Sequence, residues 1–214
     1  FGTVNFGAGN VTSAGDDVFV TKLNASGAHQ WTTTLGGTSS EYGYGVAVDS
    51  SGNVYTTGFF VGTVNFGAGN VTSVGSYDVF VTKLNASGAH QWTTTLGGTS
   101  GDYGYGVAVD SSGNVYTTGF FVGTVNFGAG NVTSAGSSDV FVTKLNASGT
   151  HQWTTTLGGT SGDRGEGVVV DSSGNVYTTG YFQGTVNFGA GNVTSAGNTD
   201  VLVTKMNASG QVIV

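Results

Sequence analysis

The sequence predicts an all-β protein built from a repeated unit of four short antiparallel strands, and three observations support this fold class. A segment beginning Gly-Thr-Val-Asn-Phe recurs at Gly2, Gly62, Gly123 and Gly184. Within one repeat, four apolar or alternating runs follow one another, and turn residues separate them. No segment has the 3.6-residue hydrophobic period of an amphipathic helix.

The repeat is about 61 residues long, and its copies are nearly identical. Residues 62–122 and 123–183 differ at only 8 of 61 positions. A fixed period of this length indicates a repeat architecture. We therefore expect one array of about 3.5 repeats, with a partial first unit followed by three further units: 1–37, 38–98, 99–159 and 160–214.

The first two strands of the unit are clearest in its second full copy. The run Gly106–Val109 is apolar at every position, so we expect both of its faces to be covered. It ends in the turn Asp110–Asn114, whose Asp, Gly and Asn residues suit a tight hairpin. The second strand, Val115–Thr118, then leads toward Phe120 and Phe121.

The last two strands follow a long connection. Residues Gly123–Ser138 form a 16-residue segment that we expect to be a loop. The third strand, Asp139–Leu145, mixes apolar residues with Thr and Lys, and the fourth, His151–Leu157, alternates in polarity. A decrease in apolar character from first to fourth strand is expected when four-stranded sheets stack around an axis with the first strand innermost. The sequence therefore predicts β-propeller blades of four antiparallel strands.

These runs also carry a family resemblance. The segments Gly-Val-Ala-Val-Asp-Ser-Ser-Gly-Asn-Val-Tyr-Thr-Thr-Gly, Asp-Val-Phe-Val-Thr-Lys-Leu-Asn-Ala-Ser-Gly and Gln-Trp-Thr-Thr-Thr-Leu-Gly-Gly resemble the bacterial β-propeller repeat family called SBBP. The layout is also similar to that of an NHL propeller blade. The resemblance recurs in each repeat and implies a propeller fold. It further implies a secreted or surface-exposed bacterial protein, from a family mostly without assigned activity.

The composition excludes several classes of function. Five Lys and Arg residues in 214 cannot form the basic surface that nucleic-acid binding needs. The absence of cysteine excludes disulfides and thiolate metal sites, and no apolar run approaches the length of a membrane span. Because the chain begins at Phe1 without a Met or a signal-peptide pattern, we expect a processed product or part of a longer chain.

No catalytic, cofactor-binding or metal-binding residue is predicted. The turns that begin at Asp49, Asp110 and Asp171 lack the Gly and Glu positions of a calcium loop. The Gly-Ala-Gly segments lack the third glycine, the helix and the Lys of a phosphate-binding loop. One His per repeat, at positions 61 residues apart, forms no local metal or nucleophile set: His29, His90 and His151. We therefore expect no enzyme activity and no cofactor.

Two groups of residues are candidates for ligand binding. The copies diverge in the segment that leads into the first strand, where loops of a propeller line the mouth of its channel. A ligand rim is therefore predicted at Tyr42, Tyr44, Tyr103, Tyr105, Arg164 and Glu166. One Trp per blade is usually a packing residue. In the alternative function, a lectin-like propeller, the same residues would each present a weak sugar platform: Trp31, Trp92 and Trp153.

Asn-x-Ser/Thr sequons occur twice per repeat. The Asn-Ala-Ser set coincides with turn chemistry. If the protein is secreted and its host glycosylates, the Asn-Val-Thr set is the better candidate for glycans: Asn10, Asn70, Asn131 and Asn192.

The phase of the repeat suggests a function. The first unit contributes only its third and fourth strands, and the last unit ends within its fourth, so sheet edges are expected to be open at both ends. Open edges pair with other chains, and a head-to-tail contact of this kind gives rings or filaments. We predict assembly edges at Val18, Val20, Val212 and Val214. The expected partners are copies of the chain or missing blades of a longer chain, and the expected function is that of a non-enzymatic extracellular structural or adhesive protein, such as a filament or surface-layer subunit.

Overall fold

The computed structural model describes residues 2–189 and 191–213. In this part of the chain there are 21 strands and no helix. The predicted all-β class is therefore confirmed. Within the same residues, no helix exists that is long and apolar enough to cross a membrane.

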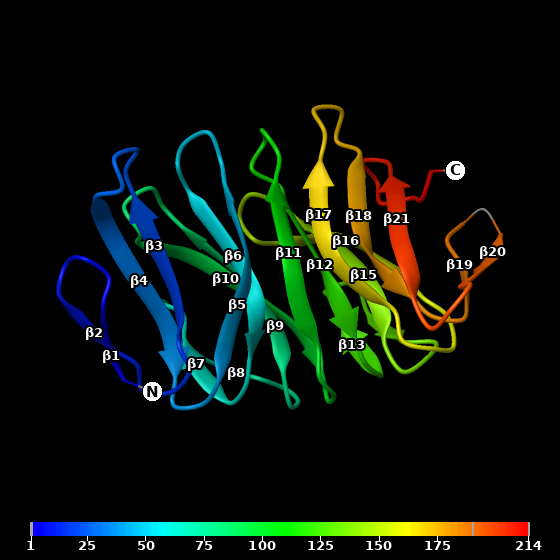
Figure 1. Cartoon of the computed structure of the whole chain (residues 1–214), viewed down its shortest axis with the longest axis horizontal. Coiled ribbons are helices and arrows are strands. Elements are labelled where there is room, and N and C mark those ends of the chain that lie inside the picture. The colour runs from blue at the N-terminus through cyan, green and yellow to red at the C-terminus, as the bar shows by residue number, and fades with distance from the viewer. Residues whose placement is uncertain (1, 190, 214) are drawn as a thin grey trace.

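The longer strands form four antiparallel sheets that follow one another from the N-terminus to the C-terminus (Figure 1). Sheet 1 consists of β3 (Val18–Leu23) and β4 (His29–Gly37). Sheet 2 has the order β5 (Glu41–Val48), β6 (Val54–Phe60), β9 (Asp78–Leu84), β10 (His90–Gly98). Sheet 3 repeats this order with β11 (Tyr103–Val109), β12 (Val115–Phe121), β15 (Asp139–Leu145) and β16 (His151–Leu157). Sheet 4 contains β17 (Arg164–Val170), β18 (Val176–Phe182) and β21 (Asp200–Met206).

The 16-residue connection between the second and third strands is a β-hairpin, so the expectation of a loop at Gly123–Ser138 is wrong. The four hairpins are β1 (Thr3–Asn5) with β2 (Asn10–Thr12), β7 (Thr63–Asn65) with β8 (Asn70–Thr72), β13 (Thr124–Asn126) with β14 (Asn131–Thr133), and β19 (Thr185–Asn187) with β20 (Asn192–Thr194). In each hairpin, a Thr-Val-Asn strand pairs with an Asn-Val-Thr strand, and these two mirrored segments are visible in the sequence.

Each of the later hairpins reaches back onto the sheet before it. In the second repeat, Val64 and Asn65 of β7 pair with Gly37 and Gly36 of β4. In the third repeat, Val125 and Asn126 of β13 pair in the same way with the end of β10. The hairpin therefore extends the preceding sheet while its chain belongs to the following one, and so it ties two successive sheets together.

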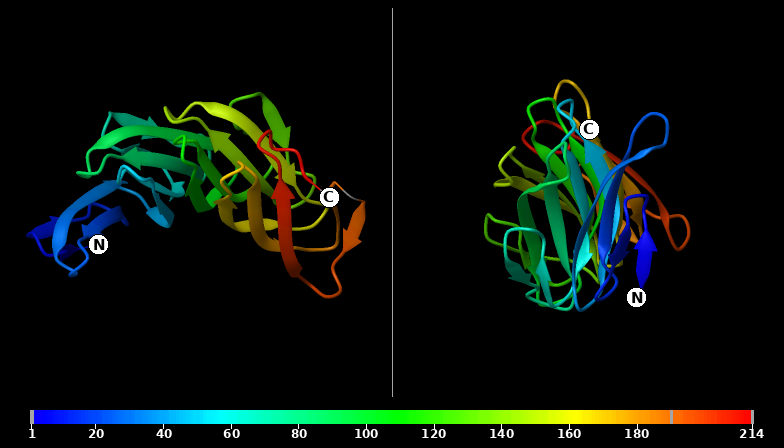
Figure 2. Two further views of the ribbon diagram at one scale, coloured as in Figure 1. Left: turned by 90° about the horizontal axis from the view of Figure 1, so that it is seen from above. Right: turned by 90° about the vertical axis from the view of Figure 1, so that its left-hand side faces the viewer.

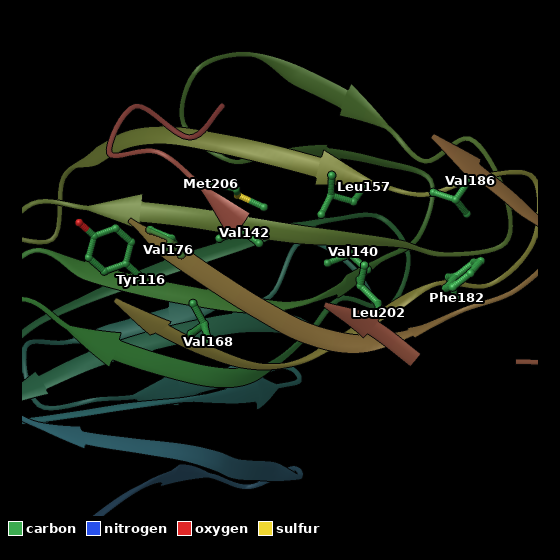
Figure 3. Close-up of a cluster of buried hydrophobic side chains, with 10 residues drawn as sticks. All are labelled: Tyr116, Val140, Val142, Leu157, Val168, Val176, Phe182, Val186, Leu202 and Met206. Carbon is green, nitrogen blue, oxygen red and sulfur yellow. The ribbon is translucent and has the colours of Figure 1, made fainter. Parts of the chain in front are cut away.

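Successive sheets pack face to face, and we call the contact between two of them a joint. Joint 3–4, between sheets 3 and 4, contains the largest cluster of buried apolar side chains, including Val140, Val142, Val168, Leu202 and Met206 (Figure 3). Joints 1–2 and 2–3 each have clusters of the same kind. Because each cluster draws residues from two sheets, apolar burial between sheets stabilises the array.

In sheets 2, 3 and 4 the first strand lies innermost. β11 packs against both β5 and β17, whereas the outer strand β10 contacts the hairpin strand β13 and, through Trp92, the turn at Ala147. The hydrophobic gradient had indicated this order of strands. The sheets form an open curved row, with the two ends of the chain at opposite ends of the molecule (Figure 2).

Candidate functional site

The predicted rim residues lie together in an aromatic cluster at one end of the inner strands. The ring of Tyr42 stacks on Phe59 at 5.1 Å between centroids, and Tyr44 lies 4.8 Å from Tyr105 across joint 2–3. Tyr103 packs edge-on against Phe59 at 4.8 Å. The structure thus brings the four tyrosines into one cluster and adds residues that the sequence analysis missed: Phe59, Tyr77 and Phe120.

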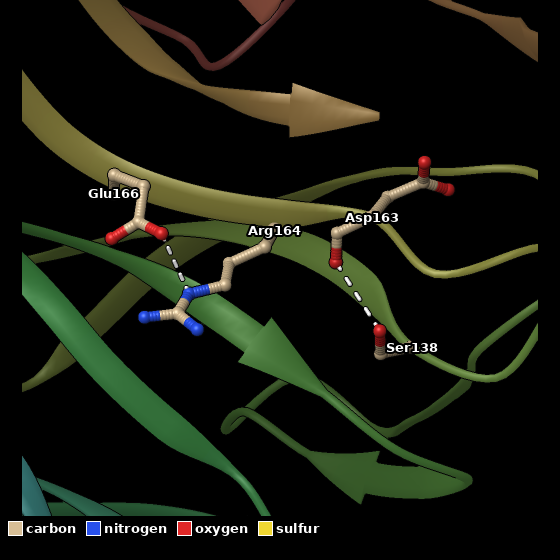
Figure 4. A network of polar contacts seen from close by, with 4 residues as sticks. All are labelled: Ser138, Asp163, Arg164 and Glu166. Atoms are coloured by element: carbon tan, nitrogen blue, oxygen red, sulfur yellow. Dashed lines mark hydrogen bonds and ion pairs between the residues drawn. The ribbon is translucent and has the colours of Figure 1, made fainter. Parts of the chain in front are cut away.

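Arg164 and Glu166 close this cluster at sheet 4. The guanidinium of Arg164 lies 3.8 Å from the ring centroid of Tyr105, and its Nε lies 2.7 Å from Oε1 of Glu166 (Figure 4). A guanidinium over an aromatic face is a favourable cation–π arrangement. The charges of Arg164 and Glu166 thus pair with each other, and the guanidinium also contacts Tyr105. Burial raises the pKa of Tyr105 to about 12.

Most rings of the cluster are packed against each other, and two are open to solvent. Tyr42 is 43% exposed and Tyr44 is 50% exposed, whereas Phe59 beneath them is buried. The hydroxyl of Tyr42 donates to Oδ2 of Asp16 at 3.1 Å, which holds the ring in place. The open part of the rim is thus an aromatic surface on β5.

The acids at the start of the inner strands are structural acceptors. Asp102 is fully buried, and its two carboxylate oxygens accept hydrogen bonds from the backbone N–H groups of Gly98 (2.8 Å) and Val122 (3.0 Å). Asp163 accepts the equivalent pair from Gly159 and Gln183. Burial raises the pKa of Asp102 to about 6, although both hydrogen bonds act to lower it. These carboxylates join the end of one sheet to the first two strands of the next.

At the same repeat position, Glu41 makes only one of these bonds. Its Oε2 accepts from the N–H of Gly37 at 2.9 Å, and Oε1 is buried without a partner. Burial raises the pKa of Glu41, with the charges of Asp17 and Asp16 acting in the same direction. The longer side chain displaces the second oxygen from the bond that Asp forms in the later repeats.

The Asp-Ser-Ser-Gly-Asn segments form hairpin turns, as the sequence predicted. Both oxygens of Asp110 accept hydrogen bonds, from Ser112 N, Asn114 N, Asn114 Nδ2 and the hydroxyl of Tyr116. Burial acts to raise the pKa of Asp110, but these hydrogen bonds outweigh it and hold the pKa below its ordinary value. Among the described residues, no group of three or more His, Asp or Glu could hold a metal ion.

Each Trp is engaged by the following sheet. The Nε1 of Trp92 donates to the carbonyl oxygen of Ala147 at 3.1 Å, and the ring lies against Gly149. Gly149 has φ +82°, and a Cβ there would stand 2.8 Å from Cδ2 of Trp92. Trp31 and Trp153 make the equivalent bonds to Ala86 and Ala208. One ring face and the polar edge of each indole are thus part of a joint.

The histidines lie beside the hairpins. Nε2 of His90 is 3.0 Å from Oγ1 of Thr93, and the side chain packs under Gly67 at the tip of the hairpin β7–β8. His29 and His151 have the same neighbours in their own repeats. Burial lowers the pKa of His90 and of His151.

The two sets of sequons differ in their surroundings. The Asn side chains of the Asn-Ala-Ser set cap turns, as Asn85 does by accepting from Ser87 N and Ala89 N. The Asn-Val-Thr set lies at the exposed start of the second hairpin strand: Asn10, Asn70, Asn131 and Asn192. A glycan on these four positions would extend into solvent without disturbing a turn.

The predicted assembly edges lie only partly at open surfaces. Val18 and Val20 are buried in joint 1–2, and the exposed apolar residues on the same strand are Phe19 and Leu23. Alternation along the strand explains the difference, because successive side chains point to opposite faces. Val212 forms an isolated bridge with Met206, and Val214 lies outside the described residues.

Repeated antiparallel sheets with face-to-face joints define this chain as a β-sheet repeat protein. A family model described as the SBBP beta-propeller repeat matches residues 30–58, 91–119 and 152–181. These three matches confirm the resemblance seen in the sequence. Each match runs from the outer strand of one sheet into the second strand of the next, so the family unit spans a joint.

One curated relative is also similar in sequence. The match covers 76% of this chain, which is 25% identical there to an uncharacterized WD repeat-containing protein of Acanthamoeba polyphaga mimivirus. The chain spans 14% of the length of that relative.

Proposed function

We propose that this chain is a non-enzymatic extracellular structural or adhesive repeat protein, in which sheets 1–4 act as propeller-type blades and copies join into a filament or surface layer. The observation that carries this proposal is that side chains with the chemistry for catalysis or ligand binding are engaged in structural contacts. Asp102, Asp110, His90 and Trp92 each form contacts that hold a turn, hairpin or joint. Repeats of this kind add stability through nearest-neighbour contacts.

The surface composition is consistent with such a role. Only 8% of the residues are charged, and the hairpins present Thr and Asn to solvent. The Thr pairs on the hairpins are also joined by cross-strand hydrogen bonds, such as Thr63 with Thr72 at 2.8 Å. A polar surface with little charge suits close packing between copies, because few charges must be removed from water.

Electron microscopy of the purified chain, over rising protein concentration and without ligand, tests this proposal. Continuous fibres or sheets with a repeat of one chain are the expected result. Discrete closed rings or monomers at every concentration, with the β-sheet circular dichroism signal intact, would contradict the filament or surface layer.

Carbohydrate binding is the second candidate function, and the exposure of Tyr42 and Tyr44 favours it. Ring faces attract the polarised C–H groups of a sugar because the face of an aromatic ring carries partial negative charge. A glycan-array screen tests it with Tyr44→Ala, and with Trp92→Ala as the variant for the platform predicted from the sequence, after circular dichroism has shown that each variant is folded. Binding that neither variant reduces would contradict a role for Tyr44 and for Trp92 in sugar binding.

A further inference from the structure

The two ends of the row expose residues that every internal joint buries. On β3, Phe19 is 56% exposed and Leu23 is 54% exposed, whereas Phe80 and Leu84 at the same repeat positions are fully buried. Phe80 and Leu84 are covered by sheet 1 at joint 1–2. We call Phe19 and Leu23 the head face.

The opposite end shows the complementary pattern. On β21, Val201 is 75% exposed and Val203 is 72% exposed. Their counterparts Val140 and Val142 are fully buried by sheet 4 at joint 3–4. We call Val201 and Val203 the tail face.

Inside the chain, these two kinds of face pack against each other. Val18 shares one apolar cluster with Phe80, and Val20 shares another with Leu84. In both pairs, a small β-branched residue of one sheet meets a larger residue of the next. The tail face carries the two valines of this arrangement, and the head face carries the Phe and the Leu.

A cavity adjoins the head face. It has a volume of about 510 Å³ and is lined by Val4, Phe6, Val11, Phe19 and Tyr42, among others. The equivalent residues at joint 1–2 enclose a filled core, in which Val64, Phe66 and Phe80 pack against Val18 and Leu35. The cavity is therefore one side of a joint whose other sheet is missing. At joint 1–2, Val18 of the preceding sheet is among the side chains that fill the equivalent space.

We propose that the tail face of one chain docks on the head face of a second copy, so that Val201 and Val203 pack on Phe19 and Leu23 in the geometry of joints 1–2 and 3–4. The proposal rests on the assembling role above and specifies its surface and polarity. The contact is heterologous, because the two faces differ, so it adds copies in one direction. Like faces do not fit, since valine against valine leaves the space that Phe80 fills at joint 1–2 and Leu202 fills at joint 3–4.

The test uses two variants, each of which blocks one face. Phe19→Lys with Leu23→Lys blocks the head, and Val201→Lys with Val203→Lys blocks the tail. Gln91→Lys is the matched control, because Gln91 is exposed on the outer strand β10 and belongs to neither face. Circular dichroism and thermal melting of each variant establish that it is folded, which is expected because all four replaced side chains are exposed.

Sedimentation velocity then measures the mass of each protein alone and of the two blocked variants mixed. We expect the unmodified chain and Gln91→Lys to increase in mass with concentration, and each blocked variant to stay monomeric. An equimolar mixture of the two should form a species of twice the monomer mass, because one free tail meets one free head. A mixture that stays monomeric, or a blocked variant that associates like the control, would overturn the proposal.

The outcomes also separate this inference from the proposed function. If the unmodified chain forms fibres that neither blocked variant abolishes, the structural role stands and the assignment of faces is wrong. If the unmodified chain stays monomeric at every concentration, self-assembly itself fails, and the assignment of faces fails with it.

Discussion

The indole nitrogen of Trp92 donates a 3.1 Å hydrogen bond to the carbonyl oxygen of Ala147, which lies 55 residues further along the chain in the next repeat. The neighbouring Thr94 donates to the carbonyl of Gly149 at 2.7 Å, so two side chains of one outer strand hold the same turn. The same pair of bonds recurs at joint 1–2 from Trp31 and Thr33. Joints are thus fixed by directional bonds at the outer strand as well as by apolar burial.

Replacing Trp92 with Phe should remove the bond to Ala147 while keeping most of the ring contact with Gly149. The loss should lower the free energy of unfolding by about 1 kcal/mol, the usual contribution of one hydrogen bond. Trp92→Ala should lower it by about 3–5 kcal/mol, because the ring contact is lost as well. Urea unfolding measures both, with Gln91→Ala as an exposed control. Equal losses for the Phe and Ala variants would show that the ring does not contribute.

Glu41→Asp should stabilise the protein. The shorter acid matches Asp102 and Asp163, whose second oxygen accepts a backbone N–H, whereas Oε1 of Glu41 is buried without a partner. Supplying one hydrogen bond to a buried oxygen should raise the free energy of unfolding by about 1 kcal/mol. The reverse exchange, Asp102→Glu, should lower it. Thermal unfolding of the two variants checks the sign, and a loss of stability in Glu41→Asp would contradict this account.

The buried carboxyl of Asp102 should make stability depend on pH. Its pKa is about 6 in the folded chain, above the ordinary value of 3.8. Between these values the folded state binds a proton that the unfolded state does not, so this contribution is present at low pH and is lost as pH rises through about 6. Unfolding free energies at pH 4 to 7.5 should therefore fall more steeply with rising pH in the unmodified chain than in Asp102→Asn.

Asp110→Asn is the control for this pH profile. Hydrogen bonds hold the pKa of Asp110 below its ordinary value of 3.8 despite its burial. The stability that it contributes is present above that value and is lost at more acidic pH. This variant should therefore keep the slope near pH 6. If Asp102→Asn and Asp110→Asn change the slope near pH 6 equally, the dependence does not come from Asp102.

Gly97→Ala should be strongly destabilising, because the outer strand approaches a buried acid there. A Cβ on Gly97 would stand 2.3 Å from Cγ of Asp78, whose carboxylate accepts from Val74 N at 2.8 Å. Either the strand or this hydrogen bond must shift, and such overpacking typically costs about 1–3 kcal/mol. Gly197→Ala is the matched control, because nothing lies within 4 Å of a Cβ there. Similar unfolding midpoints for the two variants would contradict the close approach.

The hydrophobic patterns of the sequence determined the local elements. The repeat length, the all-β class and strands such as β15 and β16 were predictable from the sequence. They follow from alternation and turn residues, which act over a few neighbouring positions. The turn at Asp110 was also predictable, since its hydrogen bonds remain within six residues. The hairpin β13–β14 was missed although its mirrored Thr-Val-Asn pattern was visible.

The tertiary structure alone decided which side chains each joint uses. Alternation places successive side chains of a strand on opposite faces of the sheet. Only the position of the neighbouring sheet determines which of the two faces is covered. That choice buried Val18 and exposed Phe19, although both are apolar and adjacent in the sequence. It also placed Trp92 against a turn 55 residues away, and Tyr44 beside Tyr105. Contacts between residues so far apart depend on the stacking of whole sheets, which no local pattern encodes.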